Sequence, residues 1–259
     1  MKINELNLVY FSPTGTTRKV IMAVAQKLNF KSVSYDLTSY KIKKPILNFK
    51  ETDFVLFAIP VYSGRVPATM LSYLEQLKGN NTPAALIATY GNRAYEDALL
   101  ELKTVVEEKG FKVIGAGAFP VEHSIIRSIA KGRPNASDLC IIKDYGVQLN
   151  RKLKELEDLS QVHLTVNGNT PYRPYKTIPL VPSASADCTE CKTCVKLCPT
   201  GAITPEHPRK TDKNKCISCM RCVRNCPAKV RQVSHFKLKI AGNKLKKSCQ
   251  EAKAPELFL

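Results

Sequence analysis

Residues 6–17 read LNLVYFSPTGTT and join an apolar run to a turn that is rich in hydroxyl side chains. The run from Leu6 to Phe11 has the length and composition of a buried β-strand. Beyond the turn, apolar residues recur at helical spacing from Thr16 to Leu28. A strand that leads through a short loop into a helix is the first part of a βαβ unit. The stretch therefore predicts an α/β domain in the first part of the chain.

The same alternation of strand and helix patterns continues to about residue 160. Four more strands are expected, at Ser32 to Leu37, Asp53 to Ile59, Ala84 to Thr89 and Lys112 to Phe119. Further helices are expected at Pro67 to Leu77, Ala94 to Lys109 and about Ser137 to Leu159. Asn135 is the expected cap of the last helix, with Asp138 completing a capping box. This pattern predicts a doubly wound parallel sheet of five strands.

The turn SPTGTT at residues 12–17 has the residue types of a phosphate-binding loop. Backbone N–H groups, hydroxyls and the positive end of the following helix dipole can together hold a phosphate without a lysine. The turn lacks the G-x-x-x-x-G-K-[ST] pattern of a P-loop and the G-x-G-x-x-G pattern of a Rossmann turn. A helix cap that binds no ligand is the structural alternative.

This part of the chain resembles the flavodoxins, and the resemblance implies FMN as a cofactor. The turn SPTGTT looks like the flavodoxin phosphate loop. The loops after the third and fourth strands fall where flavodoxins hold the isoalloxazine ring, at the carboxyl ends of the strands. The implied FMN-binding residues are Ser12, Thr14, Gly15, Thr16, Thr17, Pro60, Val61, Tyr62, Ser63, Gly64, Thr89, Tyr90, Gly91, Asn92 and Tyr95.

The resemblance also assigns roles to individual side chains. Flavodoxins stack an aromatic residue from each of the two later loops on the flavin, so Tyr62 and Tyr95 are expected to sandwich the ring. Gly64 matches the glycine whose peptide rotates toward the reduced ring, a motion that glycine permits at least cost. Arg65 and Arg93 depart from the usual pattern, because they bring positive charge close to the ring. Plain packing of the aromatic rings in the core is the alternative.

Residues 164–186 predict a linker, because four prolines exclude a regular helix or central strand there. These prolines are Pro171, Pro174, Pro179 and Pro182. We expect the α/β domain at residues 1–163, the linker at 164–186, a cysteine-rich domain at 187–235 and a basic tail at 236–259.

The cysteine-rich domain contains an internal repeat. Residues 188–199 read CTECKTCVKLCP, and residues 216–227 read CISCMRCVRNCP. Both have the spacing C-x-x-C-x-x-C-x-x-x-C-P, in which one tight loop supplies three thiolates to a cubane. A zinc site would leave half of these eight thiols unexplained. Disulfides require an oxidising compartment. Cys140 and Cys249 lie outside the repeat and are expected to be ordinary thiols.

The repeat resembles that of bacterial ferredoxins with two 4Fe-4S clusters, and the predicted small domain therefore has an α+β fold. In this family the fourth cysteine of each half ligates the cluster of the other half. The resemblance implies two ligand sets. Cluster one takes Cys188, Cys191, Cys194 and Cys226, and cluster two takes Cys216, Cys219, Cys222 and Cys198.

The charge is strongly basic and uneven. Of the formal net charge of +18, residues 1–150 contribute +6 and residues 151–259 contribute +12. Nucleic acid, an anionic membrane or an acidic protein could each balance such an excess. No recognition-helix motif favours nucleic acid, and no apolar run approaches the length of a membrane span. Basic residues lie between the cluster ligands, namely Lys192, Lys196, Arg221 and Arg224. We expect an acidic redox partner, either a ferredoxin or a flavoenzyme.

The combined resemblance implies an electron carrier that relays electrons between two 4Fe-4S clusters and FMN in low-potential anaerobic metabolism. No residue need act as an acid, base or nucleophile for that function, so no catalytic residue is expected. The absence of a signal-peptide pattern at the N-terminus leads us to expect a cytoplasmic protein. The alternative is an FMN-dependent oxidoreductase that reduces a quinone or nitro compound with electrons supplied through the clusters.

Overall fold

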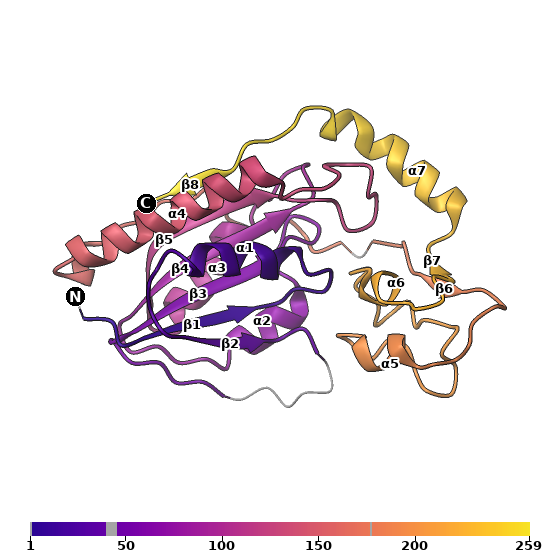
Figure 1. Cartoon of the computed structure of the whole chain (residues 1–259), viewed down its shortest axis with the longest axis horizontal. Helices are drawn as coiled ribbons and strands as arrows, with labels where there is room; N and C mark the ends of the chain where they lie inside the picture. The colour runs from indigo at the N-terminus through magenta and orange to yellow at the C-terminus, as the bar shows by residue number, and fades with distance from the viewer. Residues whose placement is uncertain (1, 40–45, 177) are drawn as a thin grey trace.

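The computed structural model describes residues 2–39, 46–176 and 178–259. Its main feature is a six-stranded sheet with strand order β2-β1-β3-β4-β5-β8 (Figure 1). The strands are β1 (Glu5–Tyr10), β2 (Ser32–Asp36), β3 (Asp53–Pro60), β4 (Thr82–Tyr90), β5 (Phe111–Pro120) and β8 (Glu256–Phe258). The first five are parallel, and their order is that of flavodoxin-like sheets. The predicted flavodoxin-like fold class is therefore confirmed.

Helices cover both faces of the sheet (Figure 1). One face packs against α1 (Thr16–Ala25) and α4 (Ala136–Glu155), and the other packs against α2 (Ala68–Leu74) and α3 (Ala98–Glu108). An apolar core lies on each side. Because the central strands are buried on both faces, they are almost continuously apolar rather than alternating.

The predicted capping box of α4 is confirmed. Asn135 Oδ1 accepts a hydrogen bond from the Asp138 backbone N–H at 3.0 Å, and Asp138 Oδ2 accepts one from the Asn135 N–H at 2.9 Å. The helix ends at Glu155, four residues before the predicted end. Leu156 already has an extended backbone, and the Asp158 side chain caps a separate 3-10 turn, η1 (Leu159–Gln161).

The C-terminal segment forms structure that we did not predict. It contains α7 (His235–Lys246), the short 3-10 turn η2 (Lys247–Cys249) and β8. Strand β8 pairs antiparallel with β5, so the sheet has six strands rather than the five predicted. The chain thus leaves the flavodoxin domain through the linker and returns to it after the cysteine-rich domain (Figure 1).

The cysteine-rich domain contains two short helices, α5 (Thr193–Leu197) and α6 (Arg221–Arg224), and a two-stranded sheet of β6 (Ser183–Ala184) and β7 (Arg231–Gln232). Its two halves have matching backbones. Lys192 and Met220, which are equivalent in the repeat, have φ values of 59° and 60°. Non-glycine residues seldom adopt this left-handed conformation. Its recurrence shows that the two halves share one local fold.

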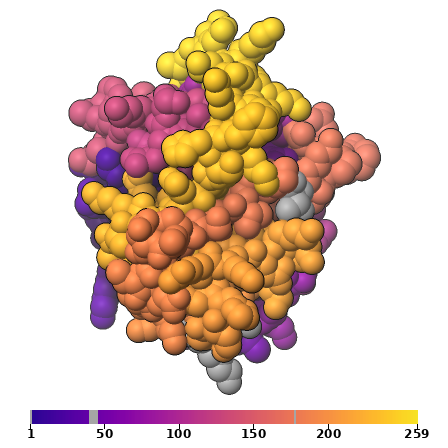
Figure 2. Space-filling model, turned by 90° about the vertical axis from the view of Figure 1, so that its right-hand side faces the viewer, coloured from indigo at the N-terminus to yellow at the C-terminus, as the bar shows by residue number. Residues whose placement is uncertain are grey.

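A small apolar core joins the two domains. Leu180 of the linker, Met220 of the cysteine-rich domain and Val233 are buried together. Ile125 of the flavodoxin domain and Leu238 of α7 pack against them. The space-filling view shows α7, in yellow, lying across the upper part of this face above the cysteine-rich domain in orange (Figure 2).

The linker is held on the flavodoxin domain by polar contacts. The Asp97 carboxylate accepts hydrogen bonds from the backbone N–H groups of Asn169, at 2.9 Å, and Arg173, at 2.8 Å. The Arg65 guanidinium lies 5.0 Å from the centre of the Tyr172 ring. The segment is therefore a docked connection rather than a free spacer. The predicted domain boundaries themselves remain predictions.

Candidate cofactor sites

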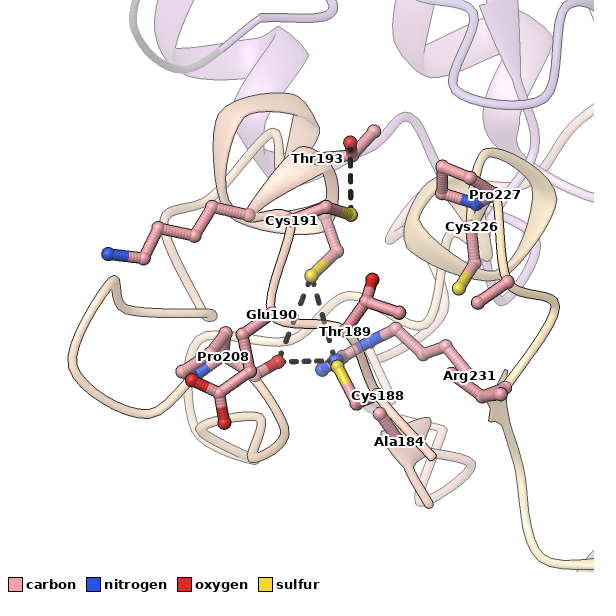
Figure 3. Close-up of a pocket in the computed structure, with 14 residues that line it drawn as sticks. Ala184, Cys188, Thr189, Glu190, Cys191, Thr193, Pro208, Cys226, Pro227 and Arg231 are labelled. Atoms are coloured by element: carbon pink, nitrogen blue, oxygen red, sulfur yellow. Dashed lines mark hydrogen bonds between the residues drawn. The ribbon is translucent and has the colours of Figure 1, made fainter. Parts of the chain in front are cut away.

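Four cysteines from both halves of the repeat surround one hollow in the cysteine-rich domain. Cys188, Cys191 and Cys194 line it together with Cys226, and the hollow measures about 360 Å³ including its opening to solvent. Figure 3 shows Cys188, Cys191 and Cys226 around this space, with Arg231 reaching toward it. We call it the cluster-one hollow. It contains the four thiols that the ferredoxin resemblance assigns to cluster one.

A second hollow, of about 300 Å³, contains the other four thiols. Cys216, Cys219 and Cys222 line it together with Cys198 from the first half of the repeat. We call it the cluster-two hollow. The two hollows have similar sizes and each receives its fourth thiol from the opposite half. This exchange of the fourth cysteine is the arrangement expected for two cubanes.

Hydrogen-bond donors point at several of these sulfurs. The backbone N–H of Ala202 donates to Cys198 Sγ at 3.3 Å, and that of Ser218 donates to Cys216 Sγ at 3.4 Å. Such donors stabilise the negative charge of ligating thiolates. Burial raises the pKa of Cys222 to about 11, and a bound cluster would require this thiol in its deprotonated form. The residues present thus fit 4Fe-4S clusters.

Each hollow gathers four thiols, which is the number that one 4Fe-4S cubane binds. A zinc ion binds each thiolate at about 2.3 Å and so gathers its ligands tightly. In a cubane each thiolate binds a different iron, which spreads the sulfurs over a larger space.

Arg231 is buried between the two sets of thiols. Its guanidinium donates to the Pro208 carbonyl at 2.7 Å and reaches Cys194 Sγ at 3.8 Å. Its positive charge lowers the pKa of both Cys194 and Cys222, against the stronger effect of burial, so it acts on both hollows. Arg231 could not be singled out from the sequence, because an arginine in a short β-strand of a basic chain has no distinctive motif.

The predicted phosphate loop divides into buried and accessible residues. Ser12 and Thr17 are buried, and the Thr17 hydroxyl lies 2.8 Å from that of Thr89 at the end of β4. Gly15 is exposed in a left-handed conformation with open space on its Cβ side. The hydroxyls of Thr14 and Thr16 lie 3.3 Å apart beside it. This open cradle at the start of α1 fits a phosphate group.

An acidic substitution in this cradle should therefore expel FMN. Thr14→Asp combined with Thr16→Asp places two negative charges where the dianionic phosphate would lie. We expect the purified variant to lose its flavin and to keep its iron, because the cysteine-rich domain is separate. Flavin absorbance and iron analysis of the anaerobically purified protein measure both. Ser72→Asp, at an exposed position on α2, is the control and should keep both. Retention of flavin by the double variant would contradict the phosphate site.

A large cavity lies between the two domains and reaches the predicted flavin loops. It measures about 1970 Å³ including its open mouth, and we call it the interdomain cavity. Six predicted FMN-binding residues line it: Val61, Tyr62, Ser63, Gly64, Tyr90 and Gly91. Its other walls come from the loop after β5, the linker, the cluster-two loop and α7. The isoalloxazine ring would lie here, beside the loops after β3 and β4.

The structure places Pro60, Thr89, Asn92 and Tyr95 away from the lining of this cavity. Tyr95 differs most from its expected role, because its side chain is buried in the core. Its hydroxyl donates to Glu256 Oε2 at 2.5 Å, and its ring lies 5.5 Å from that of Tyr90. The predicted sandwich by Tyr62 and Tyr95 is therefore not formed by this arrangement of the side chains.

Asn92 holds the C-terminal segment instead of facing the cavity. Its Nδ2 donates to the Glu251 carbonyl at 2.9 Å, and its Oδ1 accepts from the Lys253 N–H at 3.0 Å. Together with the hydrogen bond from Tyr95 to Glu256, these contacts hold the C-terminal segment beside the loop after β4. No local motif signals these contacts, since the partners are separated by about 160 residues.

His123 lines the interdomain cavity, although the sequence analysis assigned it no role. Its Nδ1 accepts hydrogen bonds from the backbone N–H groups of Ile125, at 3.2 Å, and Ile126, at 3.0 Å. Burial, and next the positive charge of Arg93, lowers its pKa to about 4. The ring is therefore neutral at pH 7, and since Nδ1 accepts, the proton is on Nε2.

Comparison with known families gives two matches. Residues 7–108 match a family described as a flavodoxin domain, and residues 187–231 match a family described as a 4Fe-4S dicluster domain. A search of curated proteins gives no match. Among the described residues, no helix combines the length and apolar character needed to cross a membrane.

The chain is also similar to several solved structures. An archaeal flavodoxin is 15% identical over 58% of this chain and 99% of that chain, with a TM-score of 0.40. A Fusobacterium nucleatum flavodoxin bound to flavin mononucleotide is 18% identical, with coverages of 58% and 99% and a TM-score of 0.41. An azoreductase from Bacillus anthracis is 12% identical, with coverages of 58% and 100% and a TM-score of 0.41.

The two family matches fall on the regions that hold the open phosphate cradle and the two four-cysteine hollows. A flavodoxin domain implies FMN, and a dicluster domain implies two 4Fe-4S clusters. The chain thus carries a flavodoxin domain and a 4Fe-4S dicluster domain, and it is an electron-transfer flavo-iron-sulfur protein.

Proposed function

We propose that the protein relays electrons in the order cluster one, cluster two and FMN, or in the reverse order, in low-potential anaerobic metabolism. One observation carries this order. Ile217, which lies between two ligands of cluster two, lines both the cluster-two hollow and the interdomain cavity. Cluster two would therefore border the space that receives the flavin ring.

Electrostatics support the same order. Burial raises the pKa of Tyr62, and the charge of the Cys219 thiolate is the next cause of that rise. Tyr62 of the flavin loop therefore lies close to a ligand of cluster two. The lining residues of the cluster-one hollow all fall between Ala184 and Arg231, within the cysteine-rich region. Cluster one would thus be the outer site, at which a partner protein exchanges electrons.

The charged surface around cluster one suits an acidic partner. Lys192 lines the cluster-one hollow, and both Lys192 and Lys196 are exposed. Arg224 instead faces the flavodoxin domain, where its guanidinium lies 3.4 Å from Glu122 Oε1. Of the basic residues among the ligands, the two lysines are thus the better candidates for docking. Charges at such a rim mainly raise the association rate.

Salt and charge reversal test the acidic partner. We expect electron transfer from a reduced acidic ferredoxin to slow steeply as salt rises, because the screening length falls from about 30 Å at 0.01 M to about 8 Å at 0.15 M. Lys192→Glu with Lys196→Glu should reproduce that slowing at low salt. Stopped-flow absorbance of the clusters measures the rate. Lys154→Glu on α4 changes the charge at an exposed position remote from the clusters and serves as the control. Equal rates in all proteins at every salt concentration would argue against an acidic partner.

The interdomain cavity favours a second candidate function, the reduction of a small organic acceptor. Only part of its wall comes from the flavin loops, and the rest comes from the linker, the cluster-two loop and α7. Space beside the ring would admit a quinone or nitro compound. Steady turnover of such a compound favours this function, whereas exchange with redox proteins alone favours the carrier.

A further inference from the structure

The walls of the interdomain cavity carry an unbalanced positive charge. Its cationic lining residues are Arg93, Arg173, Lys176, Lys237 and Lys244. None of the described residues that line it is an aspartate or a glutamate. The cavity is therefore much more basic than a site for a neutral ligand requires.

Local ion pairs neutralise only a small part of this charge. Arg93 and Arg173 share one carboxylate, that of Glu96, which lies outside the lining. Within the described part of the chain, Lys237 and Lys244 have no carboxylate oxygen within 4.0 Å. Burial and the charge of Arg93 lower the pKa of Arg173, whose buried Nε lacks a hydrogen-bond partner. An anion in the cavity would relieve this crowding of positive charge.

Helix α7 supplies one wall with both charge and apolar surface. The residues of α7 that face the cavity recur at helical spacing, namely Lys237, Ile240, Ala241, Lys244 and Leu245, and Ser248 of η2 follows them in the lining. Apolar residues of the loop after β5, Ile125 and Ile126, contribute to the same lining. A ligand here would meet apolar surface for a ring and ammonium groups for an acid group.

His123 adds a directed hydrogen-bond donor to the same space. Two backbone N–H groups occupy its Nδ1, so the neutral ring carries its proton on Nε2. Within the described residues, no group accepts a hydrogen bond from Nε2. A neutral donor of this kind suits a carbonyl, carboxylate or sulfonate oxygen.

We propose that the interdomain cavity binds a small aromatic anion, with its acid group near Lys237 and Lys244 and an oxygen within reach of His123. This inference rests on the proposed function, since the ligand would be the small acceptor of the second candidate and would lie beside the flavin. A quinone sulfonate would take up two electrons, supplied singly by a reduced ferredoxin-type donor through the clusters, and two protons from water. The product would be the corresponding hydroquinone, with no atom lost.

Binding of 2-naphthoate and its uncharged analogue 2-naphthamide tests the site without turnover. The protein is used anaerobically with FMN and both clusters loaded. We expect 2-naphthoate to bind at least about tenfold more tightly than the amide in calorimetry, because two partly exposed ion pairs form. It should also perturb the visible spectrum of the flavin. Equal affinities for the two compounds, or binding without a spectral change, would overturn the proposal.

Matched variants locate the charge that matters. Lys237→Gln with Lys244→Gln should weaken binding of 2-naphthoate about tenfold and leave 2-naphthamide unaffected. Lys239→Gln with Lys246→Gln removes the same charge from exposed positions of α7 outside the cavity lining and should change neither affinity. His123→Asn keeps an acceptor for the two backbone N–H groups, removes the Nε2 donor and should also weaken 2-naphthoate binding. If both double-lysine variants lost affinity for 2-naphthoate equally, the effect would be one of general charge, and the proposed site would be rejected.

The outcomes also separate this inference from the proposed function. A protein that reduces its flavin through the clusters yet binds no 2-naphthoate would refute the anion site alone. A protein that binds no flavin would refute the proposed relay before the anion test begins.

Discussion

Replacing Cys219 with serine should reduce the flavin reduction rate to its background value. Cys219 is a buried ligand in the cluster-two hollow, which borders the interdomain cavity through Ile217. Without an intact cluster two, electrons on cluster one would lack an intermediate site before the flavin. The measurement is anaerobic stopped-flow absorbance of the flavin with reduced methyl viologen, a one-electron donor. The background is the rate of the Cys191→Ser, Cys219→Ser double variant.

The matched control is Cys191→Ser, which removes an exposed ligand from the cluster-one hollow. This variant keeps cluster two beside the flavin, so a small donor should still reduce the flavin through it, well above background. Iron analysis establishes that each single variant retains its other cluster. A fast Cys219 variant together with a slow Cys191 variant would reverse the proposed order of the clusters.

Replacing Arg231 with glutamine should lower the reduction potentials of both clusters. Each cluster gains one negative charge on reduction, and the buried guanidinium near Cys194 and Cys222 stabilises that charge. A unit charge about 4 Å away at an effective dielectric constant of about 20 corresponds to a shift on the order of 100 mV. Redox titration followed by electron paramagnetic resonance measures both potentials. In Arg231→Lys the reduction potentials of both clusters should stay close to those of the unchanged protein, because lysine retains the positive charge.

Lys229 is exposed on the same segment as Arg231. Lys229→Gln therefore serves as a control for the loss of a nearby charge, and it should shift the reduction potentials little. Potentials that do not change in Arg231→Gln, with iron content retained, would show that the guanidinium only stabilises the fold. The buried hydrogen bonds of Arg231 to the Pro208 and Lys210 carbonyls make some loss of stability expected in both Arg231 variants.

The features that could be predicted from sequence have local causes. The apolar runs of the central strands and the turn at residues 12–17 predict the sheet and its phosphate loop, because strand, loop and helix follow directly in the chain. The capping box of Asn135 and Asp138 spans four residues and is confirmed. The resemblance of the cysteine repeat to that of dicluster ferredoxins implies the two thiol sets, and the structure gathers the same sets around two hollows.

The features that were missed depend on contacts between distant segments. Tyr95 has the spacing of a flavin-stacking residue, but Glu256 accepts a hydrogen bond from its hydroxyl and the ring packs with Tyr90. Strand β8 has only three residues and pairs with β5, which is more than 130 positions earlier. His123 lies at the interdomain cavity because the linker and α7, which are distant in the sequence, form the other walls of that cavity. None of these contacts leaves a periodic or spaced pattern in the sequence.

The most direct test of the relay is an anaerobic reductive titration of the purified protein, followed by absorbance and electron paramagnetic resonance. We expect an uptake of about four electrons per chain, about two on FMN and about one on each of two 4Fe-4S clusters. All three cofactors should also exchange electrons within one molecule. An uptake of about two electrons, with cluster signals and no flavin, would contradict the proposed relay.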